Sequence, residues 1–217
     1  MSRGSLTTTS YAVLGLLAVG PWSSYELTQQ MDRSLGRVWP RAVSKLYEEP
    51  KKLVAHGLAR SSTQLHGRRP RTVYSITAQG RQALAAWLNE PGAGPVLEFE
   101  HLLKVFFAEN GTKADLLATL AAAQAWSRMR CEESMAIAEQ YRAGQGPYPE
   151  RLPELQLTSR FVTDFYVLVG EWAGWARDIV EGWPDDPNKA AHDPAVIAET
   201  ARRAAAGAAG AGSAVGG

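Results

Sequence analysis

Apolar side chains recur at helical spacing through the first quarter of the chain. Segment 7–19 is apolar at intervals of three and four residues, with Thr7 as a candidate N-cap and Pro21 as a stop. Second and third helices are expected at residues 23–36 and 40–57, because apolar positions repeat there with the same period and a Gly closes each segment. The pattern therefore predicts three short helices in succession.

The apolar pattern then changes to period two. Residues 58–65 and 72–77 are short, β-compatible runs, and the Gly/Pro turn between them, residues 66–71, carries three Arg. This arrangement indicates a β-hairpin with a basic tip. A fourth helix is expected from Thr77 to Leu88. Three helices, a hairpin and a helix occur in the order of a winged helix-turn-helix.

Long helices are expected in the second half of the chain. Residues 89–95 form a Pro/Gly linker, and a short helix follows at 97–109. A long helix is predicted from about residue 112 to 144, and a last one from about 154 to 182. Residues 185–217 are rich in Ala and Gly and poor in large apolar side chains, so a mostly disordered tail is expected.

The last helix carries a heptad seam of large apolar side chains, spaced alternately by four and three residues. A helix of this kind needs a large apolar partner, which the preceding helix and a second copy of the chain can supply. The alternative is an ordinary buried helix of a monomer. The predicted dimer interface consists of Phe161, Phe165, Leu168, Trp172, Trp175 and Ile179.

These patterns predict a mainly α fold with two domains and a tail. Residues 1–90 are assigned to a winged helix-turn-helix DNA-binding domain with a two-stranded β-wing. Residues 91–184 are assigned to a helical dimerisation domain in which a small effector can bind, and 185–217 to the tail.

The charge of the chain is divided unevenly between these parts. Residues 1–90 hold 12 Lys and Arg against 5 Asp and Glu, whereas the remaining residues hold 11 against 17. A basic half next to an acidic half suggests that the basic half meets a polyanion such as double-stranded DNA. Chance segregation of charge is the alternative reading.

Two segments have the residue types that DNA contact requires. A recognition helix places polar or cationic side chains at base edges and phosphates, and the start of the third helix offers such groups. The hairpin tip offers cations for a neighbouring groove or backbone, although a solvated loop is the plainer interpretation of three Arg on a turn. The candidates are Arg37, Trp39, Arg41, Ser44 and Lys45 before and within the helix, and Arg68, Arg69 and Arg71 on the hairpin.

Enzymatic and metal-dependent functions find little support. The chain has no nucleophile motif, P-loop or dinucleotide fingerprint, and we expect no cofactor and no bound metal. Glu98, Glu100 and His101 cluster on one predicted helix and form the one metal-binding alternative, with a surface charge group preferred. Cys131 is the single cysteine, and a structural thiol is preferred over a redox sensor.

Composition also bears on the compartment. A single cysteine excludes a disulfide framework within the chain and favours the cytoplasm. No apolar run reaches the roughly 20 residues of a membrane span, and segment 6–25 lacks the basic start and cleavage site of a secretion signal. We therefore expect no membrane partner.

An ordered set of sequence motifs runs through the first four predicted helices and the hairpin. The first is Leu14-Gly15-Leu16-Leu17, followed by Gly20-Pro21 and Tyr25-Glu26-Leu27. The others are Lys45-Leu46-Tyr47 with Leu53 and Gly57-Leu58, and Arg71 to Thr77 with Gly80. Taken in this order, the motifs resemble the PadR family of transcriptional regulators. The resemblance covers about residues 6–90, and the helices beyond are similar, more loosely, to the longer PadR subgroup.

This resemblance implies a homodimer whose recognition helices and wings address an inverted repeat. It also implies repression that a small aromatic or drug-like molecule relieves, and a role for Tyr47 in bonding phosphate or positioning the helix. Two residues depart from the family pattern: Ser24 replaces a frequent Gly, and Pro50 replaces a frequent Leu. Since Pro removes a helix hydrogen bond, we expect the recognition helix to bend or be irregular near residues 46–50.

The alternative function is a protein-interaction module on a winged-helix scaffold without sequence-specific DNA binding, because a fold does not fix a function. The seven Trp bear on the effector. Aromatic walls suit a flat apolar ligand, but they suit a dimer core as well, and core is the preferred reading for any one Trp.

Overall fold

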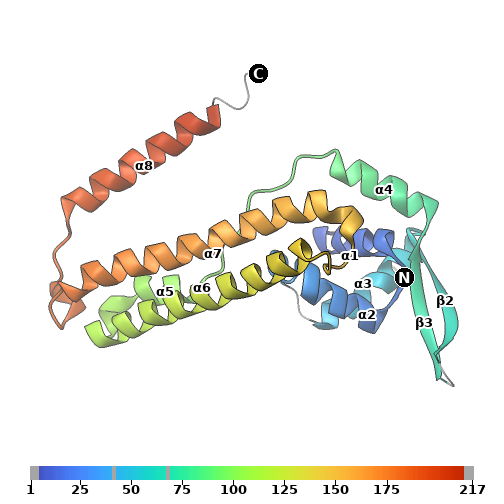
Figure 1. Ribbon diagram of the computed structural model, residues 1–217, viewed down its shortest axis with the longest axis horizontal. Coiled ribbons are helices and arrows are strands. Elements are labelled where there is room, and N and C mark those ends of the chain that lie inside the picture. Colours follow the sequence, from blue (N-terminus) through green and yellow to red (C-terminus); the bar gives the residue numbers. More distant parts are fainter. Residues whose placement is uncertain (1–4, 41–42, 67–68, 213–217) are drawn as a thin grey trace. The chain divides into compact units, whose positions relative to one another are not determined.

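The computed structural model describes residues 5–40, 43–66 and 69–212, with the side chains of residues 43–45, 66, 69 and 210–212 outside the description. The chain divides into two compact units, residues 1–96 and 97–217 (Figure 1). This boundary lies at the end of the predicted linker 89–95, six residues beyond the expected domain limit at residue 90.

The first unit contains the predicted helices. They are α1 (Thr8–Val19), α2 (Ser24–Gln30), α3 (Val43–Ala55) and α4 (Ala78–Leu88). Thr7 caps α1, because its side chain accepts a hydrogen bond from the Ser10 backbone N–H. One turn was not anticipated: α2 continues as a π-helical segment, η1 (Met31–Leu35), before it ends at Gly36.

A small antiparallel sheet completes this unit. Strands β2 (Ala59–His66) and β3 (Arg69–Ile76) form the predicted hairpin, in register from Ala59 opposite Ile76 to His66 opposite Arg69. A third strand, β1 (Trp22–Ser23), pairs with β3 on its other edge, and the strand order is β1-β3-β2. The winged helix-turn-helix is therefore confirmed, with a sheet one strand larger than the two-stranded wing expected.

Apolar side chains from all of these elements meet in one core. Leu14 of α1 and Leu53 of α3 have no exposed surface, and Trp22 donates its indole N–H to the Leu16 carbonyl near the end of α1 (3.0 Å). Tyr11 and Trp87 stack between α1 and α4 with ring centroids 5.1 Å apart. The buried core consists of Val13, Leu14, Leu16, Leu17, Leu27, Met31, Leu46, Leu53, Leu58, Ala59 and Tyr74.

The end of α3 is joined to the start of α4 by a compact set of backbone bonds. Gly57 adopts a left-handed conformation (φ +75°), which lets the Leu58 N–H bond to the Leu53 carbonyl at 2.9 Å. Thr77 then donates its hydroxyl to the Gly57 carbonyl at 2.7 Å and caps α4. Gly80 lies so close to Leu58 that a Cβ on Gly80 would fall 2.1 Å from the Leu58 carbonyl oxygen. These contacts fix the base of the wing.

Pro50 does not interrupt the third helix. Residues 43–55 form one continuous α-helix with Pro50 inside it, so the predicted irregularity at residues 46–50 does not appear as a break. The Pro50 side chain is fully buried. Burial of the ring contributes favourably against the loss of the N–H bond, and it depends on tertiary contacts that the local rule does not include.

Two long antiparallel helices dominate the second unit. They are α6 (Lys113–Arg142) and α7 (Leu152–Glu181), joined through the 3-10 turn η3 (Pro149–Arg151). The short helix α5 (Glu100–Phe106) and the 3-10 turn η2 (Ala108–Asn110) precede them, close to the prediction for 97–109.

Polar contacts near the middle and at one end fix the pairing of α6 with α7. Near the middle, the Ser127 hydroxyl donates to the Tyr166 carbonyl at 2.7 Å. Gly170 makes this close approach possible, since a Cβ there would lie 2.5 Å from the Ser127 hydroxyl oxygen. At the far end, the Lys113 ammonium donates to the Glu181 and Trp183 carbonyls, a favourable position for a cation at a helix C-terminus.

The expectation of a mostly disordered tail is wrong for its described part. Residues 185–212 contain the 3-10 turn η4 (Pro187–Lys189) and the helix α8 (Pro194–Gly212). Alanine has the highest helix propensity, and Glu199 pairs with Arg202 and Arg203 one turn away, so the helix needs no apolar face. Residues 213–217 lie outside the described part. Among the helices of the described residues, none combines the length and the hydropathy that a membrane-spanning segment requires.

Candidate nucleic-acid interface

Helix α3 has one face in the core and one in solvent. Leu46, Pro50 and Leu53 are buried, whereas Tyr47 is 37% exposed. Glu48 and Lys51 lie in solvent beside it and form an ion pair of 3.2 Å. Tyr47, Glu48 and Lys51 constitute the outer face of α3, the face available to a partner.

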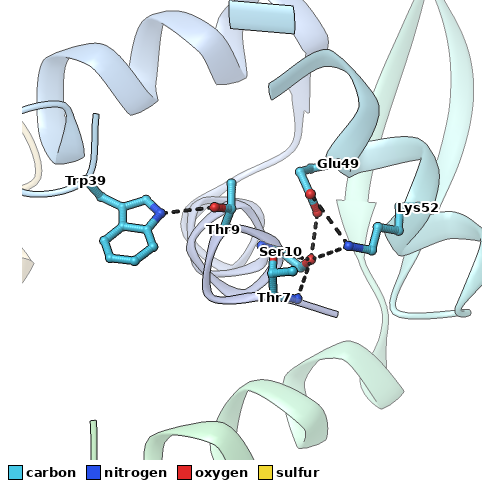
Figure 2. A network of polar contacts seen from close by, with 6 residues as sticks. All are labelled: Thr7, Thr9, Ser10, Trp39, Glu49 and Lys52. Carbon is cyan, nitrogen blue, oxygen red and sulfur yellow. Dashed lines mark hydrogen bonds and ion pairs between the residues drawn. The ribbon is translucent and has the colours of Figure 1, made fainter. Parts of the chain in front are cut away.

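A polar network holds α3 against α1 (Figure 2). Ser10 of α1 is fully buried, and its hydroxyl donates to the Glu49 carboxylate at 2.7 Å. Lys52 donates to the same Ser10 oxygen at 3.1 Å and lies 3.6 Å from Glu49. The Thr7 backbone N–H adds a further bond to Ser10 Oγ at 3.0 Å. One hydroxyl thus joins two charged side chains of α3 to the first turn of α1.

Trp39 extends this attachment to the segment that leads into α3. Its indole N–H donates to the Thr9 hydroxyl at 3.1 Å (Figure 2), and its ring is half-buried against the core. Thr9 is the neighbour of Ser10, so both attachments use the same turn of α1. In this structure Trp39, predicted to contact DNA, anchors the segment before α3.

Arg71 of β3 is paired within the protein. Its guanidinium donates to Glu26 Oε1 of α2 at 2.8 Å. The other carboxylate oxygen of Glu26 accepts from the Ser23 backbone N–H and hydroxyl, each at 2.8 Å. The Ser23 N–H is the main cause that holds the pKa of Glu26 below its ordinary range, and the Ser23 hydroxyl and Arg71 lower that pKa further, against the effect of burial.

The structure locates part of the predicted DNA-contact set. Arg37 is exposed ahead of α3, Tyr47 lies on its outer face, and Arg71 lies on the wing beside α2. Arg41 and Arg68 lie outside the described residues, as do the side chains of Ser44, Lys45 and Arg69.

The sequence patterns missed Lys51, Glu26 and Ser10. Lys51 lies one helical turn beyond Tyr47 and seven residues beyond Ser44, a spacing that placed it on the same face and that could have been used. Glu26 and Ser10 act through partners 45 and 39 residues away, which no local spacing reveals.

The predicted seam on α7 lies largely outside the packing of α6 against α7. Val162, Tyr166, Val169 and Ala173 are the buried α7 residues along the middle of this helix. In the seam, Phe161, Leu168 and Trp175 are 65%, 58% and 51% exposed, whereas Phe165, Trp172 and Ile179 are half-buried. Phe161, Leu168 and Trp175, seven residues apart, form the exposed stripe of α7.

Aromatic rings gather beside this helix. Phe99 lies 5.9 Å from Trp172 and 6.4 Å from Trp126, and Trp126 meets Tyr166 edge-on at 5.3 Å. All four rings are buried or half-buried, as expected for a packed core of this unit. Between α5 and the start of α6 lies an open, mainly apolar groove of about 530 Å³, lined in part by Leu103, Phe107 and Leu116.

The residues considered as alternatives for metal binding and thiol chemistry make contacts that are common on helix surfaces. Glu100 pairs with Lys104 at 2.9 Å, and the His101 ring lies 5.3 Å from Phe99. No three His, Cys, Asp or Glu side chains are grouped as metal ligands anywhere in the described chain. Cys131 is a half-buried free thiol.

Residues 13–86 match the family model described as the transcriptional regulator PadR-like family. The negative transcriptional regulator PadR of Bacillus subtilis (strain 168) is 34% identical over 99 residues. That match covers 45% of this chain and 54% of the relative, so the chain spans about half the length of this curated protein.

Solved structures extend the similarity to the helical unit. Bacillus subtilis PadR in complex with operator DNA has a TM-score of 0.70 at 22% identity, over 80% of this chain and 99% of that one. The same protein in complex with p-coumaric acid has a TM-score of 0.65 at 21% identity, over 81% and 99%. At these identities the likeness concerns the fold.

Proposed function

Since residues 13–86 of this chain match the PadR-like family of transcriptional regulators, we propose that the chain is a dimeric DNA-binding repressor. Its target is an inverted repeat, which two recognition helices related by a two-fold axis address. The outer face of α3 contacts base edges and phosphates, and the basic hairpin tip contacts the neighbouring backbone.

The observation that carries this proposal is the coincidence of the family match with the winged helix-turn-helix. The matched residues run from α1 to α4 and include the whole of α3 and the wing. The same part of the chain holds the excess of cations. The operator complex of Bacillus subtilis PadR, a protein of the same fold, supports DNA as the partner.

The exposed stripe of α7 supports the dimeric state. Large apolar side chains in water at heptad spacing are typical of an unpaired coiled-coil face. Pairing of two α7 helices across a two-fold axis would bury Phe161, Leu168 and Trp175 from both copies.

A salt-series binding titration tests DNA binding. Wild type is titrated against the DNA upstream of its own coding region and against a scrambled duplex, beside Lys51→Ala and the double variant Arg68→Ala/Arg69→Ala. We expect specific binding whose affinity falls steeply with salt, and a slope smaller by about 0.9 for each phosphate contact removed. Equal, weak binding to both duplexes would contradict the proposal and favour the protein-interaction module.

Transcription in vitro tests the direction of regulation. With the bound promoter as template, a repressor lowers transcript yield as protein is added. A rise in yield would make the chain an activator and leave DNA binding intact.

We propose a phenolic acid as the class of effector, because Bacillus subtilis PadR has been solved with p-coumaric acid. A ligand relieves repression only if it binds the DNA-free conformation better than the DNA-bound one. Addition of p-coumaric acid to the complex is expected to release DNA, with benzoate as a control of equal charge. If it binds the protein without changing DNA affinity, an effector role is excluded for that compound.

A further inference from the structure

A wing arginine that binds a phosphate needs a guanidinium that is free to point outward, whereas the guanidinium of Arg71 is ion-paired within the protein. Its side chain is 36% exposed, and its guanidinium donates to Glu26 Oε1 at 2.8 Å. Its Nε is buried without a hydrogen-bond partner within the described residues. The guanidinium therefore points toward Glu26, and its positive charge is neutralised by that carboxylate.

Glu26 is held from two sides. Oε1 accepts from Arg71 of β3, and Oε2 accepts from the N–H and hydroxyl of Ser23 at the start of α2. Ser23 also belongs to β1, where it pairs with Val73 of β3. A single carboxylate thus links the N-terminus of α2 to the strand that carries the wing, next to a β-ladder only two residues long.

We propose that Arg71 is a positioning residue that fixes the wing relative to α2 through Glu26, rather than a phosphate contact. The inference rests on the proposed DNA binding. If Arg71 left Glu26 to reach a phosphate, a 31% exposed carboxylate would remain beside a polyanion without a neutralising cation, an electrostatically unfavourable arrangement. The ion pair between Arg71 and Glu26 both neutralises the carboxylate and orients the hairpin.

Substitution of Glu26 distinguishes the two roles by the sign of its effect. If Arg71 contacts phosphate, Glu26 competes with DNA for the guanidinium, so Glu26→Gln strengthens binding. If Arg71 positions the wing, Glu26→Gln loosens the link and weakens binding. Glutamine keeps an acceptor for the Ser23 N–H, so the cap of α2 is retained while the charge is removed.

The test is a salt-series titration of the upstream DNA with wild type, Glu26→Gln, Arg71→Gln and the double variant. We expect each single variant to weaken specific binding by about threefold to tenfold, as loss of a charged hydrogen bond would, without a change in salt slope. The double variant should bind no more weakly than the weaker single one, because both changes break the same link. Arg71→Lys, which keeps a cation for Glu26, should recover part of the loss.

Asp32→Asn is the matched control. Asp32 is an exposed carboxylate of the same unit, so removal of its charge should leave DNA binding unchanged or slightly stronger. Thermal unfolding of each variant and stoichiometric titration of its active fraction separate weaker binding from loss of folded protein.

Two results would overturn the proposal. One is tighter binding by Glu26→Gln. The other is an Arg71→Gln slope that is smaller by about 0.9, the value for one lost phosphate contact. Either result would contradict the role of Arg71 and would leave the proposed DNA binding unaffected. If the wild type shows no specific binding, both the proposed function and this inference are wrong.

Discussion

At the scale of single residues, the space around Cα determines what can be exchanged. Gly80 has no room for a side chain, because a Cβ would lie 2.1 Å from the Leu58 carbonyl oxygen and 2.9 Å from Ile76 Cγ1. Gly15, in the middle of α1, has nothing within 4 Å of the same position. Gly15 and Gly80, both part of the family pattern, therefore differ in how much room each leaves for a side chain.

Substitution of Gly80 by Ala should destabilise the first unit by about 1–3 kcal/mol or more, because the backbone at the base of the wing must move. Urea denaturation by circular dichroism measures this change. Gly15→Ala is the control, and it should be neutral or stabilise by up to about 1 kcal/mol through helix propensity. Equal stability of the two variants would show that the close approach at Gly80 is relaxed at no cost.

Glu26 makes stability depend on pH. Contacts led by the Ser23 N–H lower its pKa in the folded protein, and unfolding returns the pKa to the ordinary value of a glutamate side chain. The stabilisation is therefore complete above that value and is lost as pH falls through the lower folded value. Thermal midpoints measured from pH 7 to pH 3 should fall more steeply for wild type than for Glu26→Gln, and parallel curves would contradict the linkage.

At the scale of elements, the attachment of α3 to α1 depends on one buried hydroxyl. Ser10→Ala removes an acceptor from Lys52 and a donor from the largely buried Glu49 carboxylate. We expect a loss of about 1–3 kcal/mol, the usual effect of leaving a buried polar group unpaired. Hydrogen–deuterium exchange of peptides from α1 and α3 measures the loosening directly.

Thr8→Ala is the control for this substitution. Thr8 is exposed in the same turn of α1, so exchange should change little, within about 0.5 kcal/mol. If Ser10→Ala and Thr8→Ala gave the same protection in α3, the network of Figure 2 would have no part in holding that helix.

Periodicity was sufficient for most elements and insufficient for two, β1 and α8. Helices α1, α3, α4, α6 and α7 and the hairpin were predicted because their apolar repeats are long or their stop signals are strong. Strand β1 has two residues, too few to show a period, and it forms only because β3 offers an open edge. For Pro50, the rule that proline disrupts a helix leaves out tertiary burial, and the ring is fully buried inside a continuous α3. For α8, the rule that a segment poor in large apolar side chains stays disordered leaves out the intrinsic helix propensity of alanine.

At the scale of the whole molecule, two apolar stripes run side by side along α7. Residues Val162, Tyr166 and Val169 are buried, whereas the exposed stripe of α7 remains in solvent. The sequence showed a single broad seam, because a helical repeat reveals which residues share a face and not which neighbour covers that face. The candidate site had the same limit: the family resemblance implied a role for Tyr47 in bonding phosphate or positioning the helix, but the pairing of Arg71 with Glu26 joins residues 45 apart, which no local pattern reveals.

A charge placed on the exposed stripe should separate the proposed dimer. Leu168→Glu introduces a carboxylate that would be buried at the interface without a partner, an effect of several kcal/mol in each copy. Light scattering after gel filtration should give twice the chain mass for wild type and the single chain mass for Leu168→Glu.

Gln156→Glu, an added charge at an exposed polar position of the same helix, should leave the dimer intact. A wild type that stays monomeric at all concentrations would contradict the dimer, and it would leave the exposed stripe to another partner.

The bond between Trp39 and Thr9 makes the protein its own optical probe. An indole whose N–H is fixed to a hydroxyl at 3.1 Å, in a half-buried setting, emits at a wavelength that depends on that bond and on nearby water. Trp39 lies at the entrance to α3, so replacement of the other six Trp by Phe leaves an emitter at the recognition helix. A shift of that emission during DNA titration would record, in real time, whether the anchor stays closed while the helix engages its target.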